Sequence, residues 1–150
     1  MKLHDDLREL LESFLSRGVE FLVVGDHAVA FHGHPRLTQD TDLFVRPTLE
    51  NGRRIVEALA AFGFGSVGLT AEDFTVPDRM IQLGRVPNRI DLLTGIFGVT
   101  FDEAWSTRVE GDLGGVRVPL IGREALIKNK RATGRPMDLA DADWLESQRG

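Results

Sequence analysis

Hydrophobic residues recur with two different periods along the chain, and the period predicts where helices and strands lie. Residues 3–15 place a leucine or phenylalanine every three or four positions, which is typical of an amphipathic helix, and Gly18 favours its end. Short apolar runs such as 21–25 instead predict buried strands. By these criteria further helices are expected over 27–31, about 48–62, 101–105, 123–132 and 136–145, and further strands over 40–45, 80–83, 89–93, 109–113 and 116–120.

The predicted order of elements is typical of an α/β (α+β) fold in which helices flank one mixed β-sheet. A length of 150 residues fits a single domain spanning 1–150, and 42% apolar residues are enough for a hydrophobic core. The chain has no cysteine, which excludes disulfides and thiolate metal sites. It also has no apolar run of membrane-spanning length and no secretory leader, so we expect a cytoplasmic protein without membrane partners.

Two aspartates two positions apart are the first candidates for chemistry. Asp40 and Asp42 lie in the predicted strand 40–45, and this spacing directs both side chains to the same face. At a separation of about 4 Å two carboxylates repel by on the order of 4 kcal/mol, and a hard divalent cation such as Mg²⁺ removes this cost. The alternative is a solvated strand face near the edge of the sheet, which is the commoner origin of such a short acidic pattern.

A third aspartate strengthens the metal interpretation. Asp91 lies inside the otherwise apolar run 89–93, and a charged group in such a strand needs a partner. If this strand lies beside 40–45, three carboxylates converge, and they require a cation or the protonation of one carboxyl group. The alternative is an ion pair between Asp91 and Arg89 or Arg36.

These residues together resemble the nucleotidyltransferase superfamily that includes DNA polymerase β and its minimal single-domain relatives. The closest resemblance is to a bacterial branch with an Arg-x-Thr-x-Asp-x-Asp stretch, which includes abortive-infection and toxin–antitoxin nucleotidyltransferases. The resemblance spans most of the chain, from Phe21 to Leu145, and includes a late lysine and an Arg-Pro-Met-Asp stretch where the branch has Arg-Pro-Lys-Asp. The matching segments are VVG at 23–25, HPRLTQDTDL at 34–43, IDLL at 90–93 and RPMD at 135–138.

The resemblance implies a two-metal site for Mg²⁺ or Mn²⁺ and an NTP substrate. In such a site Asp40 and Asp42 would hold both metal ions, and Asp91 would hold the catalytic ion and help to deprotonate the acceptor hydroxyl. The turn at Gly25 and the start of the next helix would hold the triphosphate. The residues expected on the nucleotide side are Gly25, Asp26, Arg36, Thr38, Lys128 and Lys130.

A basic segment near the end of the chain fits an anionic ligand on separate grounds. Residues 121–136 carry five cationic side chains against one glutamate, a net charge of +4 in a chain whose net charge is −5. We expect Lys128 to be the first phosphate contact and Lys130 the second, with Asp138 orienting one of the cations. The alternatives are a solvated helix face for the basic segment and a simple first-turn carboxylate for Asp138.

One departure from the family pattern bears on activity. The turn glycine is followed by Asp26, where relatives carry glycine, serine or alanine, and a carboxylate facing the phosphates would repel an NTP. The alternative role for Asp26 is a helix N-cap. The chain is therefore expected to be a nucleotidyltransferase acting on an RNA (such as tRNA), protein or small-molecule hydroxyl, or else a weak or inactive member of the fold that binds a cognate toxin or antitoxin chain. A homodimer fits either interpretation.

Overall fold

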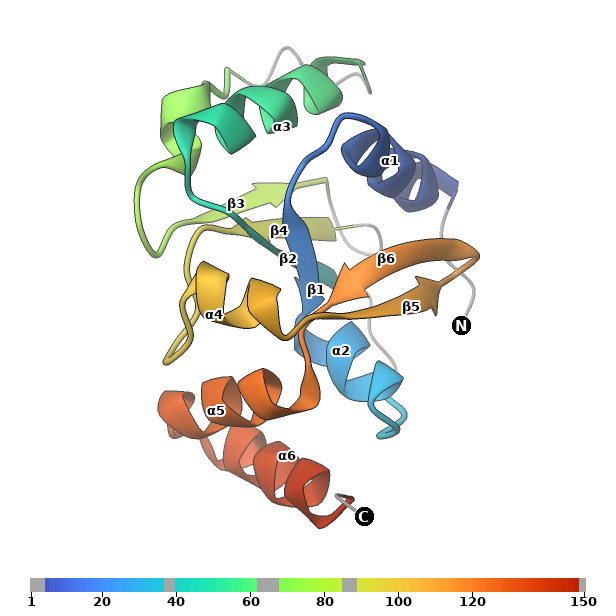
Figure 1. The fold of residues 1–150 in the computed structure, drawn as a ribbon, viewed down its shortest axis with the longest axis vertical. Helices are drawn as coiled ribbons and strands as arrows, with labels where there is room; N and C mark the ends of the chain where they lie inside the picture. Colours follow the sequence, from blue (N-terminus) through green and yellow to red (C-terminus); the bar gives the residue numbers. More distant parts are fainter. Residues whose placement is uncertain (1–4, 37–39, 62–67, 85–88, 149–150) are drawn as a thin grey trace.

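The computed structural model describes residues 5–36, 40–61, 68–84 and 89–148, and their strands form one mixed sheet (Figure 1). The strands are β1 (Phe21–Val24), β2 (Asp40–Val45), β3 (Met80–Leu83), β4 (Arg89–Leu93), β5 (Val109–Leu113) and β6 (Val116–Leu120). Their order across the sheet is β3-β4-β2-β1-β6-β5. Parallel pairing joins β2 to β4 and β1 to β6, and the other neighbours are antiparallel. The predicted fold class, a mixed sheet flanked by helices, is confirmed.

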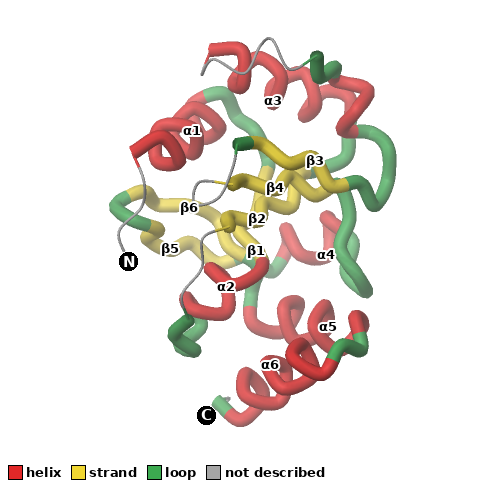
Figure 2. Tube along the Cα trace, turned by 180° about the vertical axis from the view of Figure 1, so that it is seen from behind, coloured by secondary structure: helices red, strands yellow, loops and turns green. Residues whose placement is uncertain are grey.

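Helices cover both faces of this sheet. The helices are α1 (Asp5–Ser16), α2 (Gly25–Phe31), α3 (Leu49–Ala61), α4 (Phe101–Ser106), α5 (Arg123–Thr133) and α6 (Pro136–Ser147), together with the 3₁₀ helix η2 (Ala71–Phe74). α1 and α3 lie on one face, and α2, α4, α5 and α6 lie on the other (Figures 1 and 2). The last two helices pack against each other as a pair at one end of the molecule.

The alternation of side chains along the strands builds one hydrophobic core on each face. On β2, Leu43 packs in the core beneath α1 and α3, whereas Phe44 packs in the core shared with α2, α4, α5 and α6. Asp40 and Asp42 lie four and two positions before Phe44 on this strand, so their side chains point to the same face of the sheet as Phe44. The two acidic side chains therefore belong to the face covered by α2 and the C-terminal helix pair.

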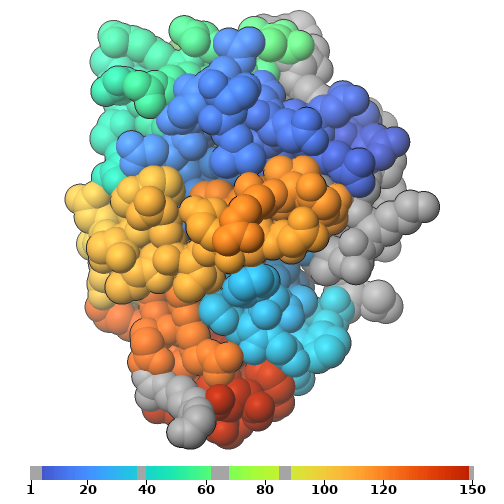
Figure 3. All heavy atoms as spheres, turned by 45° about the vertical axis from the view of Figure 1, so that its right-hand side comes forward, coloured from blue at the N-terminus to red at the C-terminus, as the bar shows by residue number. Residues whose placement is uncertain are grey.

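The hairpin β5–β6 closes one edge of the sheet, and Figure 3 shows it on the surface between α1 and α2. Its turn is formed by Gly114 and Gly115, whose φ angles are +61° and +96°. Two consecutive residues with positive φ are typical of the tight turns that suit the twist of a hairpin. The sequence-based prediction of a hairpin at these two glycines is confirmed.

Most predicted boundaries agree with the structure. Five strands have the predicted limits, and β1 is one residue shorter because Gly25 is already the first residue of α2. Thr48 caps α3 as expected, since its hydroxyl accepts a hydrogen bond from the backbone N–H of Asn51 at 3.2 Å. The 3₁₀ helix η2 was not predicted. The expectations for Leu3, Phe62 and the loop at 63–67 fall outside the described residues.

Among the described residues, no helix is both long enough and apolar enough to cross a membrane.

Candidate nucleotidyl-transfer site

Three acidic side chains come together on the neighbouring strands β2 and β4. The strands are parallel, and their register pairs Asp42 with Asp91 and Asp40 with Arg89. Side chains in register on adjacent strands point to the same face, so all four share one face of the sheet. Asp91 is only 4% exposed. The prediction that the strand of Asp91 lies beside the strand of the other two aspartates is confirmed.

The proximity of these carboxyl groups disfavours the charged form of Asp42. Burial and the neighbouring charge of Asp91 raise the pKa of Asp42 to about 6. A hydrogen bond between the carboxyl groups of Asp42 and Asp91 and the charges of Asp40 and Asp26 act in the same direction. Because two carboxyl groups can share a hydrogen bond only when one is protonated, this pair is a place where a proton or a cation is stabilised.

Arg89 partly neutralises the acidic cluster. Its Nη2 lies 2.8 Å from Asp40 Oδ2 and 3.3 Å from Asp91 Oδ2, and its Nε lies 3.3 Å from Asp91 Oδ1. The alternative of an ion pair between Asp91 and Arg89 is therefore correct, whereas Arg36 pairs elsewhere. Arg89 and Asp91 are two positions apart on β4, so their side chains lie on the same face of the sheet. The ion pair is therefore part of the acidic cluster.

The donor set suits a divalent cation only in part. In the portion of the chain that the structure describes, no three histidine, cysteine, aspartate or glutamate side chains are arranged as a metal-binding group. Asp91 Oδ1 is nonetheless buried, and within that portion no hydrogen bond reaches it. A buried carboxylate oxygen that lacks a hydrogen bond, next to a second carboxyl group, fits a hard cation. The pair Asp42 and Asp91 therefore fits such an ion, whereas Asp40 is held by Arg89.

The carboxyl group of Asp42 packs directly against Gly25, where a side chain would leave no space for it. This glycine, the first residue of α2, has a φ of +69°. A Cβ atom at this position would lie 2.4 Å from Asp42 Oδ2, which is closer than atoms can approach. The turn between β1 and α2 therefore requires glycine both for its backbone conformation and for the packing of Asp42 against it.

Asp26 does not cap α2, so the N-cap interpretation is wrong. The N-cap position is held by Val24, and Asp26 lies in the first turn of the helix. The carboxylate of Asp26 instead pairs with Arg36 Nη1 at 2.9 Å, and the same guanidinium holds Asp141 of α6 through Nη2 at 2.6 Å. Arg36 therefore neutralises Asp26 and joins the start of α2 to α6. The expected nucleotide contact Thr38 falls outside the described residues.

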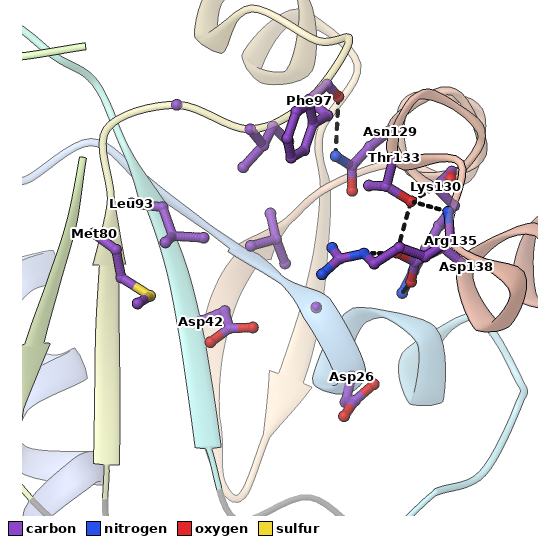
Figure 4. A pocket seen from close by; sticks show the side chains of 14 residues that line it. Asp26, Asp42, Met80, Leu93, Phe97, Asn129, Lys130, Thr133, Arg135 and Asp138 are labelled. Carbon is purple, nitrogen blue, oxygen red and sulfur yellow. Dashed lines mark hydrogen bonds and ion pairs between the residues drawn. The ribbon is translucent and has the colours of Figure 1, made fainter. Parts of the chain in front are cut away.

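A pocket of about 400 Å³ lies beside the acidic strands (Figure 4). One wall is formed by the sheet and the loop after β4, and the opposite wall by α5, α6 and the turn between them. Asn129 of α5 closes the rim by donating a hydrogen bond to the carbonyl oxygen of Phe97 at 3.0 Å. The lining residues are Val24, Gly25, Asp26, Asp42, Met80, Leu93, Gly95, Ile96, Phe97, Asn129, Lys130, Thr133, Arg135 and Asp138.

Of the two candidate lysines, Lys130 faces this pocket. It is 8% exposed, and its Nζ lies 3.1 Å from Asp138 Oδ1 and 3.2 Å from Asp141 Oδ2. Lys128 does not line the pocket, and its exposed side chain pairs with Glu103 of α4 at 2.5 Å. Two residues that are two apart on a helix point in nearly opposite directions, so only one of them can reach the pocket. The sequence led us to expect Lys128 as the first phosphate contact and Lys130 as the second, but it is Lys130 that lines the pocket.

Asp138 organises the polar end of the pocket. It accepts hydrogen bonds from Lys130 Nζ, from Thr133 Oγ1 at 2.7 Å and from Arg135 Nε at 2.9 Å. These donors hold the pKa of Asp138 below its usual value, although burial alone would raise it. Asp138 thus orients a lysine and an arginine, as one of the two sequence interpretations expected, and it is also a first-turn carboxylate of α6.

The basic segment 121–136 is not an open cationic surface. Arg131 pairs with Asp143 and Glu146, and the cations at 128, 130 and 135 pair with acidic side chains of α4 and α6. These partners, Asp141 above all, were not predicted from the sequence. The signal was present as carboxylates recurring every two or three positions from 138 to 146, which a helix packed on α5 can present to its basic side chains.

The pocket thus has Asp42 of β2 on one side and Lys130 of α5 on the other. A family model described as "Nucleotidyl transferase of unknown function (DUF2204)" matches residues 3–147, and the chain belongs to this family. The resemblance expected from the sequence is confirmed at the level of the superfamily.

Solved structures have the same fold at low sequence identity. The protein TM1012 from Thermotoga maritima has a TM-score of 0.55 and 14% identity, with 95% of this chain and 88% of that chain covered. The lincosamide antibiotic adenylyltransferase LnuA, solved with lincomycin bound, has a TM-score of 0.55 and 14% identity, with 97% and 98% covered. An antigenic nucleotidyltransferase-like protein from Paracoccidioides brasiliensis has a TM-score of 0.53 and 13% identity, with 93% and 74% covered. No curated protein matches the chain.

Proposed function

We propose that this protein is a Mg²⁺- or Mn²⁺-dependent nucleotidyltransferase that moves a nucleoside monophosphate from an NTP to a hydroxyl group. The observation that carries the proposal is the in-register pair Asp42 and Asp91 beside a pocket whose opposite wall holds Lys130. Paired carboxylates bind the cations that phosphoryl chemistry needs, and a lysine across the pocket suits the phosphates. Membership of a nucleotidyltransferase family supports this assignment.

The proposed metal ligands are Asp42 and Asp91, with Asp40 as the third. When bound, the ions supply positive charge that offsets the charge developing on the α-phosphate and on the leaving pyrophosphate. The raised pKa of Asp42 supports a cation at this position, because a cation stabilises the ionised form that burial disfavours.

The proposed reaction makes and breaks one bond to phosphorus. The acceptor oxygen bonds to the α-phosphorus, the bond from that phosphorus to the oxygen bridging to the β-phosphate breaks, and pyrophosphate leaves. The hydroxyl proton would pass to the carboxylate of Asp91 and then to solvent. Asp42 and Asp91 would thus bind the metal ions at the reacting centre, and Asp91 would also accept the proton.

The α5–α6 wall is proposed to bind the triphosphate. Lys130 has three ammonium protons, and its two carboxylate partners Asp138 and Asp141 fix the direction of the third. Arg135, whose side chain is 71% exposed, lines the same pocket, and its Nε is held by Asp138. We therefore assign the phosphate contacts to Lys130 and Arg135 rather than to Lys128.

Among the candidate acceptors we favour a small hydroxylated molecule over RNA. A phosphodiester backbone needs a cationic groove, and the basic side chains of the α5 segment are already paired with α4 and α6. The net charge of −5 also repels a polyanion. Similarity in fold to an adenylyltransferase of a small antibiotic agrees with this preference. Label recovered in the RNA or protein fraction of the label-transfer experiment would indicate one of those acceptors instead.

Catalysis is preferred to a purely binding role because Asp26 is neutralised. The expectation of a weak or inactive protein that pairs with a toxin or antitoxin depended on repulsion between Asp26 and the triphosphate. The ion pair of Asp26 with Arg36 removes most of that repulsion. A stoichiometric partner that co-purifies, with cellular function retained in Asp42→Asn, would instead support the binding role.

Label transfer tests the proposed function. The protein is incubated with cell extract, Mg²⁺ or Mn²⁺, and NTPs labelled at the α- or the γ-phosphate, and the products are separated into small-molecule, RNA and protein fractions. We expect α-label, and no γ-label, in the small-molecule fraction, with loss of transfer in Asp42→Asn and retention in the matched exposed variant Glu57→Gln. Transfer of γ-label would indicate a kinase, and transfer that persists in Asp42→Asn would exclude this site.

A further inference from the structure

We propose that Arg89 is an internal counter-ion that occupies the cation position between Asp40 and Asp91, and that a divalent ion must displace it to bind both carboxylates. The inference rests on the metal site of the proposed function and adds a competing group from the chain itself. Its basis is the pair of contacts from one guanidinium to both aspartates, at 2.8 Å and 3.3 Å.

The competition follows from the identity of the atoms involved. Arg89 Nη2 takes Asp40 Oδ2 as its acceptor and also lies near Asp91 Oδ2. These carboxylate oxygens are the same atoms that a Mg²⁺ or Mn²⁺ ion would use. A guanidinium and a metal ion cannot occupy the space between the two carboxylates together, so binding of one excludes the other.

The strand register places the Arg89 side chain beside the acidic cluster. Arg89 lies opposite Asp40 and two positions before Asp91, so its side chain emerges on the acidic face. Its side chain is 32% exposed and therefore has a route to solvent. Displacement thus needs only a change of side-chain rotamer and no movement of β4.

The ion pair is incomplete, which makes exchange favourable. Arg89 Nε and Asp91 Oδ1 are both buried, and within the described residues neither has a hydrogen-bond partner, although they lie 3.3 Å apart. The contacts of Arg89 reach Asp40 and Asp91 and leave the repulsion between Asp42 and Asp91 in place. A divalent ion with two positive charges satisfies more of the cluster than a single guanidinium does.

Arg36 provides an internal contrast. Its guanidinium makes two hydrogen bonds to Asp141, at 2.6 Å and 3.2 Å, and a third to Asp26. Its side chain is 19% exposed, against 32% for Arg89. The bidentate pair of Arg36 with Asp141 is a structural tie between α2 and α6, whereas Arg89 makes one short hydrogen bond, to Asp40, and its contacts to Asp91 at 3.3 Å are weaker and exchangeable.

Metal titration of the full chain tests this inference. Mn²⁺ affinity is measured by electron paramagnetic resonance for the wild type, Arg89→Gln, Asp42→Asn and the remote control Arg54→Gln, each checked for folding by circular dichroism. We expect Arg89→Gln to bind Mn²⁺ about tenfold more tightly than the wild type, because the competitor is removed, while Arg54→Gln is unchanged. Asp42→Asn is expected to lose binding.

A second readout follows Arg89 itself in the wild type. The Arg89 Nε–H resonance, assigned by its absence from Arg89→Gln or by through-bond correlation if that variant does not fold, is expected to shift and to exchange faster with water when Mg²⁺ is added. An unchanged resonance at saturating Mg²⁺, or equal Mn²⁺ affinity in Arg89→Gln, overturns the inference. If Asp42→Asn still loses binding in that case, the metal site survives. Absence of Mn²⁺ binding in both the wild type and Arg89→Gln overturns the metal site and this inference together.

Discussion

Asp42 on β2 and Asp91 on β4 lie opposite each other in register, and this pairing together with burial raises the pKa of Asp42 to about 6. The fold therefore holds two carboxyl groups where the charged form of one of them is disfavoured. Such an arrangement costs stability in the metal-free protein, and natural proteins tolerate that cost at functional sites. The following predictions separate the cost to stability from the gain in function.

The first prediction concerns pH and the stability of the metal-free protein. Because the pKa of Asp42 is higher in the folded state than in the unfolded state, the folded state binds the extra proton between about pH 4 and pH 6. The contribution of Asp42 to the free energy of unfolding is thus complete below pH 4 and is lost as the pH rises through about 6. Asp42→Asn should be more stable than the wild type by on the order of 1–2 kcal/mol at pH 7.5, allowing for solvent screening, with a difference that shrinks toward pH 4.

Urea denaturation of both proteins across this pH range, in the presence of a chelator, measures that difference. Glu57→Gln on the exposed side of α3 is the matched control, and it should show no comparable dependence on pH. A wild type as stable as Asp42→Asn at pH 7.5 would contradict the placement of Asp42 beside Asp91.

The second prediction concerns activity in the same variants. Asp42→Asn and Asp91→Asn should each lower kcat for label transfer by at least about a hundredfold, because each removes a ligand for the cation that stabilises the transition state. Asp42→Asn should therefore be both more stable and inactive. Activity of Asp91→Asn close to that of the wild type, in protein that is folded by circular dichroism, would rule out the proposed role of Asp91.

The third prediction concerns Gly25 and its contact with Asp42. Gly25→Ala should lower stability by about 1–2 kcal/mol through its positive φ alone, and should displace the Asp42 carboxyl group in addition. Gly68→Ala is the matched control, because Gly68 has a φ of +77° and no atom of the described residues lies within 4 Å of its added Cβ. Label transfer should fall only in Gly25→Ala, and equal activity of the two variants would argue against the contact.

The fourth prediction concerns Asp26. Since Arg36 neutralises this carboxylate, Asp26→Ser should leave kcat/KM for the NTP within about threefold of the wild type. Steady-state kinetics at fixed acceptor concentration measure the ratio. A tenfold rise in kcat/KM would mean that Asp26 repels the triphosphate in spite of Arg36.

The fifth prediction distinguishes the two lysines. In Lys130→Met, Asp138 and Asp141 lose a buried cation but keep Arg135 and Arg36 as partners, so the cost should be about 1–3 kcal/mol of stability. Lys128→Met removes an exposed pair and should cost under about 0.5 kcal/mol. Calorimetry should also show weaker NTP binding only for Lys130→Met. The reverse pattern of NTP binding would restore Lys128 as the phosphate contact.

Much of the fold could be predicted because local chemistry decides it. The hairpin follows from Gly114 and Gly115, whose positive φ angles few other residues adopt, and the strand limits follow from apolar runs bounded by turn residues. The capped start of η2 could also have been found. Thr70 and Asp73 form reciprocal hydrogen bonds there, with the spacing of a capping box.

The candidate site was only partly predictable because its charges are paired across elements distant in sequence. The aspartates were identified from their positions in apolar strands, and their meeting followed from strand order. The partners of Arg36 and Lys130 could not be found in this way, since Asp141 is 105 residues beyond Arg36 and its proximity depends on how α6 packs. A net charge counted along a segment likewise does not reveal which of its cations face a pocket and which face acidic helices.

Whether Asp42 and Asp91 form a cation site is tested most directly by a carbon-detected NMR titration of the carboxyl group of Asp42, with and without Mg²⁺. We expect a pKa of about 6 in the metal-free protein and a much lower pKa at saturating Mg²⁺, since a bound cation favours the ionised carboxylate. A carboxyl group that titrates near 4 in both conditions would contradict the claim that Asp42 and Asp91 form a cation site.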